Sequence, residues 1–118
     1  MFNIKEVQAH CDIPCKIYDP ATAQIATLSV IRLLDLIAEL GDPLKSPADA
    51  AQLSRLVEQK ETHAASVKHD VVTIWGDYFK APQIEAHPDV HNLVHTIMQQ
   101  ASKCKQEIYR ENGEKLLE

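Results

Sequence analysis

The strongest constraint on the fold is an apolar repeat at spacings of four and three residues that covers most of the chain. This spacing marks one face of an α-helix, and over several turns it is typical of helices packed side by side. In residues 47–78 only Lys60 interrupts it, and residues 20–40 and 88–108 carry the same pattern. The repeat predicts these buried positions: Ala26, Val30, Leu33, Ile37, Leu40; Leu53, Val57, Ala64, Val67, Val71, Ile74, Tyr78; Val90, Val94, Ile97, Ala101, Cys104, Ile108.

Prolines and glycines divide the repeat into three long helices. Asp19-Pro20, Ser46-Pro47 and His87-Pro88 each combine a polar cap with a proline suited to the first helical turn. Asp49 stands where a capping-box acid would follow Ser46, and Gly41 ends the first helix. Gly113 either ends the third helix or starts a turn into a fourth. The predicted fold is all-α, an up-and-down antiparallel bundle of the four-helix type with a short fourth helix.

Composition narrows the range of partners. The net charge is −5 and the pI is near 5.6. Because nucleic-acid binding requires a basic surface, we expect no nucleic-acid partner. Residues 1–9 lack the apolar stretch of a secretory signal, and we expect no membrane-spanning run and a cytoplasmic location. Three cysteines are an odd number, which favours metal binding or burial over a disulfide scaffold.

The stretch HCDIPCKIYDP, residues 10–20, concentrates metal-ligating groups. Cys11 and Cys15 flank a proline, so a tight turn can bring both thiolates to one ion. The cluster is short of ligands for structural zinc. Cleavage between Ala9 and His10 would add a free amine and an imidazole to the two thiolates and a backbone amide nitrogen. Such a nitrogen and sulfur set suits Ni(II) or Cu(II) better than zinc.

The same stretch resembles the nickel hook of the nickel superoxide dismutases, whose pattern is H-C-x-x-P-C-x-x-Y after a short removable leader. His10, Cys11, Pro14, Cys15 and Tyr18 occupy every specified position. A second family-like stretch is WGDYFK, residues 75–80. The resemblance implies one nickel ion per subunit, bound by His10, Cys11 and Cys15, and the disproportionation of superoxide to dioxygen and hydrogen peroxide.

The resemblance also implies an organisation for the chain. A peptidase would remove residues 1–9, and residues 10–118 would form the hook and a bundle subunit that assembles into a homohexamer. Tyr18 would gate small anions and order water beside the metal, and Asp12 would help to hold the shape of the hook. Ala26 and His63 stand where the family has a glutamate and an arginine that orient the axial imidazole, and Lys16 stands where glycine is common.

Other interpretations stay open from sequence alone. The chain could be a helical protein that binds nickel or copper without turnover, or a purely structural bundle. Cys104 lies on the apolar repeat and is predicted to be buried rather than to bind metal. His87, His91 and His95 are spaced one helical turn apart, but no carboxylate completes a second metal site.

Overall fold

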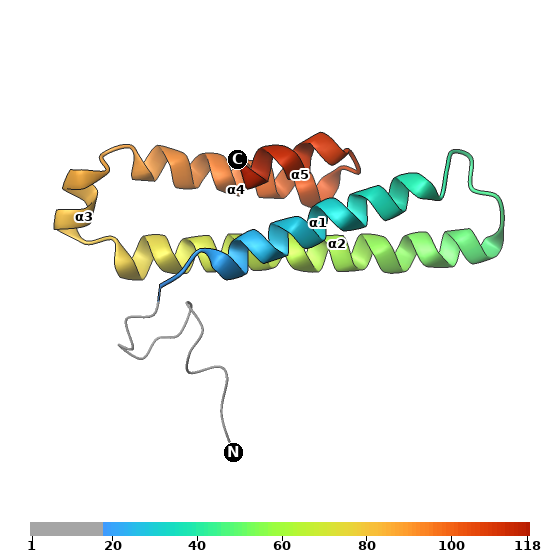
Figure 1. Ribbon diagram of the computed structural model, residues 1–118, viewed down its shortest axis with the longest axis horizontal. Helices are drawn as coiled ribbons and strands as arrows, with labels where there is room; N and C mark the ends of the chain where they lie inside the picture. Colours follow the sequence, from blue (N-terminus) through green and yellow to red (C-terminus); the bar gives the residue numbers. More distant parts are fainter. Residues whose placement is uncertain (1–17) are drawn as a thin grey trace, which may run out of the picture.

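The computed structural model describes residues 18–118, and that part of the chain is mostly helical and contains no strand (Figure 1). The helices are α1 (Ala21–Glu39), α2 (Pro47–Thr73), α3 (Ala81–Ala86), α4 (Val90–Gln106) and α5 (Arg110–Leu117), and α2 continues into a π-helical turn, η2 (Ile74–Tyr78). Helix α1 packs against α2 and α5, and α4 packs against the same two helices. The long helices alternate in direction (Figure 1), which confirms the predicted up-and-down bundle.

The helix ends follow the predicted signals with one difference. The Asp19 carboxylate accepts the amide of Ala21 at 2.8 Å, and Gly41 ends α1 with a positive φ of 85°. Ser46 accepts the amide of Asp49 at 3.2 Å. In a capping box the Asp49 carboxylate would accept the amide of the cap residue, Ser46. It accepts the amide of Lys45 instead, one residue earlier, at 3.2 Å. The start of α2 is therefore capped from both directions.

The centre of the bundle is a small cluster formed by α1, α2 and α4. It consists of Val30, Leu34, Ala64 and Cys104, with Leu116 of α5 packed against it. The predicted apolar faces were right in direction and partly wrong in register. Leu33 and Leu40 are half-buried, because α1 is covered on two sides and Ile31 and Leu34 occupy its inner face.

On α2 the inner face is shifted by one residue at two points relative to the prediction. Leu56 and Asp70 are buried one residue before Val57 and Val71, which were expected to be buried, and Leu53 and Val57 are half-buried. Val71 and Ile74 are also half-buried, and Tyr78 is 45% exposed. On α4, Val94 and Ile97 are also half-buried. Like α1, this helix packs against two others, α2 and α5.

Lys60 does not interrupt the packed face of α2 but is its most deeply buried large side chain, with 1% exposure. Its ammonium group donates to the carbonyl oxygens of Lys105 at 2.7 Å and Glu107 at 2.9 Å. These carbonyls lie at the end of α4, where helix amides no longer satisfy them. Burial lowers the pKa of Lys60, while the charge of nearby Glu61 raises it. A lysine here caps a neighbouring helix from the side.

The chain reverses just beyond this cap, so the third long helix ends at Gln106 and not at the predicted Ile108, which is 50% exposed. Gly113 neither ends a helix nor forms a turn. It lies buried in the middle of the short fourth helix, α5. A Cβ atom at this position would lie 2.6 Å from Cγ1 of Ile31. Glycine therefore allows α5 to approach α1 closely.

The connection between α2 and α4 contains α3, which the prolines concealed in the sequence. The Lys80 amide donates to the Gln83 side chain at 3.0 Å and so starts this short helix. His87 was expected to open the next helix, but Asp89 occupies the position before α4. The ring of His87 instead contacts Phe79.

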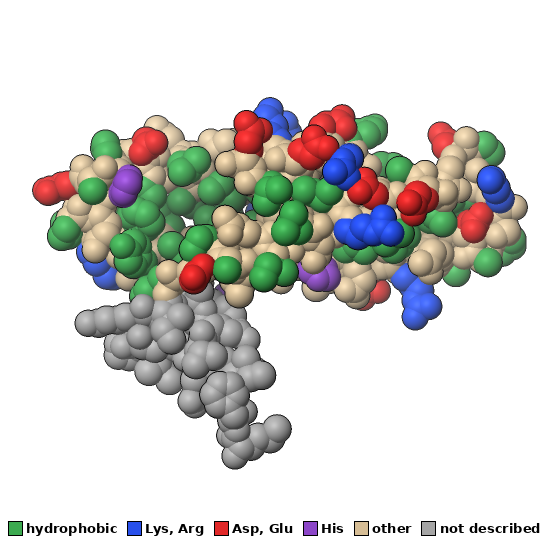
Figure 2. Space-filling view, viewed as in Figure 1, with side chains coloured by type: hydrophobic (Ala, Val, Ile, Leu, Met, Phe, Trp, Pro, Cys, Tyr) green, Lys and Arg blue, Asp and Glu red, His purple; other side chains and the backbone are tan. Residues whose placement is uncertain are grey.

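The outer face of α1 is also apolar, with Ile25 63% and Leu28 52% exposed. As a result α1 reaches a mean hydropathy of 1.5 over 18 residues, enough in length and composition for a membrane span. This corrects the expectation of no such run, although a bundle's core helix meets the same criteria. Figure 2 shows hydrophobic side chains around a hollow between α1 and α4. An apolar groove of about 300 Å³ there is also lined by α2 and the end of α5.

The buried thiol of Cys104 predicts a specific dependence of stability on pH. Burial raises its pKa from 9.0 to about 11, and nearby Lys60 partly opposes this. Because the unfolded thiol ionises first, the stabilisation is complete below pH 9 and is lost as the pH rises to 11. Two pKa units correspond to about 2–3 kcal/mol.

We therefore expect the free energies of unfolding of the original protein and Cys104→Ala to converge as the pH rises from 9 to 11, measured by urea denaturation. Apart from Lys60, whose charge interacts with Cys104, the other groups titrate in the same way in both proteins. Parallel pH profiles would show that the thiol is not buried in this way.

Candidate metal centre

The structure shows where the proposed metal-binding segment joins the bundle. His10, Cys11, Asp12 and Cys15 lie outside the described residues, as does Lys16. Tyr18 is the first described residue, and it directly precedes the cap of α1. The hook is therefore attached to the bundle at the start of α1, beside the end of α2 (Figure 1).

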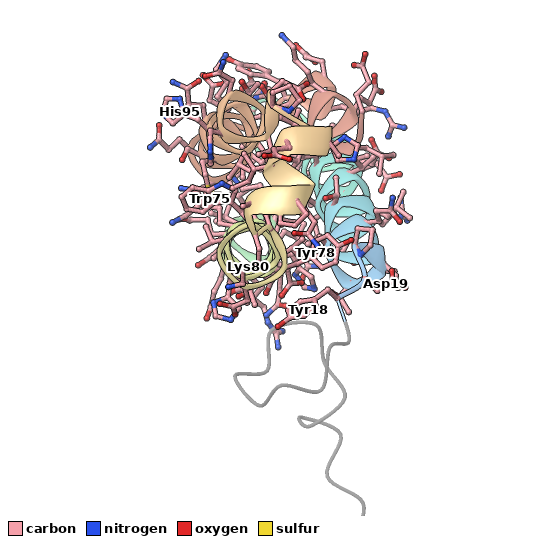
Figure 3. All side chains as sticks on the ribbon, turned by 90° about the vertical axis from the view of Figure 1, so that its left-hand side faces the viewer. Tyr18, Asp19, Trp75, Tyr78, Lys80 and His95 are labelled. Carbon is pink, nitrogen blue, oxygen red and sulfur yellow. The ribbon has the colours of Figure 1, made fainter. Side chains whose placement is uncertain are left out.

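Tyr18 is half-buried and contacts Tyr78, which lies sixty residues later in the chain. Their ring centroids are 5.8 Å apart and the rings are tilted by 52°. Figure 3 shows the two rings side by side at this end of the bundle. The pairing places a second phenol next to the residue that the sequence predicts to gate anions.

Tyr78 belongs to a wider aromatic cluster built on the WGDYFK stretch. Its ring meets Phe79 edge to face at 5.3 Å, and Phe79 meets His87 in the same manner at 6.4 Å. Trp75 donates its indole N–H to Nδ1 of His91 at 2.9 Å. These contacts fasten η2 to the segment that leads into α4 and to α4 itself.

Charged side chains of both signs surround the cluster. Lys80 is exposed on the same end of the molecule as Tyr18 and Asp19 (Figure 3). Its position agrees with the idea that it adds positive potential near the path of an anion. Asp77 lies in η2 and Asp19 caps α1, so this end carries no purely positive patch.

Ala26 and His63 occupy the two positions where the resemblance implies side chains that orient the imidazole. Ala26 is buried on α1 with 8% exposure. His63 lies on α2, where its Nδ1 is 2.7 Å from the carbonyl oxygen of Gln59 one turn earlier. That ring nitrogen must carry the proton, because a carbonyl can only accept. His63 is thus engaged with its own helix.

No second metal site is formed within residues 18–118. No three histidine, cysteine or acidic side chains there lie close enough to hold one ion. His87, His91 and His95 do not converge: the first packs on Phe79, the second accepts from Trp75, and the third lies farther along α4 (Figure 3). Cys104 is a free, buried thiol as predicted.

Tyr78 is the site-bordering residue that sequence reasoning missed. The apolar repeat includes it as the last buried position of α2, yet its ring faces Tyr18 and is largely exposed. The repeat could not distinguish the two roles, since an aromatic ring satisfies either. The available signal was its place in WGDYFK, beside Phe79 and directly before the break in the helix.

Comparison with known proteins agrees with this arrangement. The family model for nickel-containing superoxide dismutase matches residues 5–118. The nickel superoxide dismutase of Streptomyces coelicolor is 37% identical over 112 residues, covering 95% of this chain and 80% of the relative. That of Streptomyces seoulensis is 35% identical over 113 residues, covering 96% and 81%.

A solved native structure of a nickel superoxide dismutase superimposes with a TM-score of 0.80 at 36% identity, over 92% of this chain and 87% of that one. The match extends beyond the bundle, because the family model begins within the segment that precedes His10. The chain therefore belongs to the nickel-containing superoxide dismutase family.

Proposed function

We propose that this protein converts superoxide to dioxygen and hydrogen peroxide at a nickel centre bound by His10, Cys11 and Cys15. Family membership across residues 5–118 supports the activity and the cofactor. The observation that carries the proposal is the complete donor pattern of residues 10–18, joined through Tyr18 to the aromatic end of a bundle of the same fold. A non-catalytic metal-binding protein is the less favoured alternative.

The donor set of residues 10–15 fits nickel. Two thiolates are soft anionic ligands, and nitrogen donors complete a set that suits Ni(II). Bound nickel supplies a one-electron redox couple, which superoxide disproportionation requires. Thiolate donation stabilises the higher oxidation state. Asp12 lies between the two cysteines in sequence and would hold the loop that brings them together.

Tyr18 and Tyr78 would control what reaches the metal. Their paired rings border the point where the hook leaves the bundle. A phenol can both donate and accept a hydrogen bond, so it can order water and supply the path for protons that peroxide formation consumes. The rings would also allow only small anions to reach the metal. Without orienting side chains at positions 26 and 63, the imidazole of His10 would be held less firmly.

Maturation would create one of the donors. While Ala9 is joined to His10, the nitrogen of His10 is an amide and not an amine. Removal of residues 1–9 by a peptidase converts it to a free amine that can bind the metal. We place the mature enzyme, residues 10–118, in the cytoplasm.

The mature subunit would assemble with copies of itself, and a hexamer is our proposal. Exposed apolar side chains on α1 and α4, including Leu28 and Leu93, support association. The groove between α1, α2 and α4 adds further apolar surface. Contiguous apolar surface of this kind marks interaction sites.

The two cysteines of the hook provide the direct test of the site. After removal of residues 1–9, Cys11→Ser and Cys15→Ser should each lose nickel and lower activity to background, because a hydroxyl replaces a thiolate. Helix content should not change, since both residues precede α1. Metal analysis, circular dichroism and superoxide consumption measure these effects. Cys104→Ser is the control and should retain nickel. Normal nickel content in either hook variant would refute the assignment.

Processing can be tested with two chains that differ only at the start. A protein beginning at His10 should bind one nickel ion per chain, whereas one that retains residues 1–9 should bind it much more weakly because the amine is absent. Intact mass and nickel titration by absorption spectroscopy compare the two. Equal affinity would show that cleavage is not required for metal binding.

If subunits assemble, the average molecular mass in solution should increase with protein concentration. Sedimentation at micromolar concentration should show an oligomer, and Leu28→Lys should weaken it by placing a charge on the exposed apolar face of α1. Thr62→Lys adds the same charge at an exposed polar position of α2 and should not. A stable monomer for the original chain would count against the proposal.

A further inference from the structure

The end of α2 departs from regular α-helical geometry at the site. Residues Ile74–Tyr78 form a π-helical turn, which is rare and is found mostly at functional positions. The turn contains both Trp75 and Tyr78. Because the two residues share one short turn, an interaction that fixes Trp75 also restricts the position of Tyr78.

Trp75 is fixed by His91 of α4. Its indole N–H donates to Nδ1 at 2.9 Å, and the two rings meet edge to face with centroids 5.8 Å apart. The indole nitrogen can only donate, so Nδ1 of His91 must be unprotonated and accept. Both partners are exposed, and the hydrogen bond therefore competes with water. The ring contact adds orientation to the bond.

At the other end of the same turn, Tyr78 contacts Tyr18 at 5.8 Å between ring centroids. Phe79 follows and packs on Tyr78 and on His87 just before α4. Two contacts thus tie the turn to the start of α4, but only that of Trp75 is a hydrogen bond.

We infer that His91 is a positioning residue for the metal site, and that it acts through Trp75 to hold the π-helical turn with Tyr78 against Tyr18. The inference rests on the proposed role of Tyr18 in controlling access to the metal. His91 contacts the turn through Trp75. Its contribution is the geometry of the turn.

The test uses the processed, nickel-loaded enzyme and its His91→Ala, His91→Asn and His95→Ala variants. The Asn side-chain oxygen can accept the indole N–H in place of Nδ1, and His95 is an exposed histidine one turn farther along α4. Trp75 is the only tryptophan, so fluorescence reports on it alone. With 3-fluorotyrosine, ¹⁹F resonances report separately on Tyr18, Tyr78 and Tyr109.

In His91→Ala we expect a shifted tryptophan emission, changed resonances of Tyr18 and Tyr78, and an unchanged resonance of Tyr109. We expect kcat/KM for superoxide to fall roughly three- to tenfold at unchanged nickel content, the scale of one lost hydrogen bond. His91→Asn should restore most of each signal, and His95→Ala should match the original enzyme. Trp75→Phe keeps an aromatic ring without the donor and should reproduce the tyrosine and kinetic effects.

Unchanged Tyr18 and Tyr78 resonances in both His91→Ala and Trp75→Phe would overturn the inference. An equal loss of kcat/KM in His91→Ala and His95→Ala would also overturn it, because the effect would then not pass through Trp75. Tyr18→Phe separates the two proposals. If that variant retains full kcat/KM, the proposed role of the Tyr18 hydroxyl at the metal fails, while the resonances still decide whether His91 positions the turn.

Discussion

The buried ammonium group of Lys60 determines where α4 ends, and the closure of the bundle depends on that end. It donates to the carbonyl oxygens of Lys105 and Glu107, which are acceptors at the end of α4, and the chain then reverses into α5. Helix α5 then packs against α1 through Gly113, where there is no room for a side chain. Helix α1 is covered on two sides, and Tyr18, to which the hook is attached, directly precedes its cap. The ammonium group of Lys60 is thus connected, through α4, α5 and α1, to the position of the site.

The sequence predicted the three long helices well because their signals are local. Caps at Asp19 and Ser46 and the glycine at residue 41 act within a few residues of the helix ends that they define. The buried register was less predictable. Whether Leu33 or Leu34 faces the centre depends on which sides of α1 its two neighbouring helices cover. The spacing of apolar residues within α1 does not contain that information. Lys60 shows the same limit, since its partners lie forty-five and forty-seven residues away.

In the candidate site, too, features set by neighbours in sequence were predictable and features set by the fold were not. The donors His10, Cys11 and Cys15 form a contiguous motif whose chemistry can be inferred from neighbours in sequence, and the structure does not test that inference. Tyr78 required the fold, because only the antiparallel arrangement of α1 and α2 brings the end of one beside the start of the other. The π-helical turn was also hidden, since its residues continue an ordinary apolar repeat.

The chemistry of the hook-side end differs from that of the rest of the bundle. The ion pairs found in residues 18–118 join Arg32 to Glu39 and Arg110 to Asp35 and Glu114, all away from the tyrosine pair. Among the contacts of the cluster around Tyr18 are the ring contact with Tyr78 and the hydrogen bond from Trp75 to His91. Salt screens exposed ion pairs but has little effect on such contacts. The ring contact between Tyr18 and Tyr78 is therefore little affected by ionic strength, while the approach of an anion to a protein of net charge −5 does depend on it.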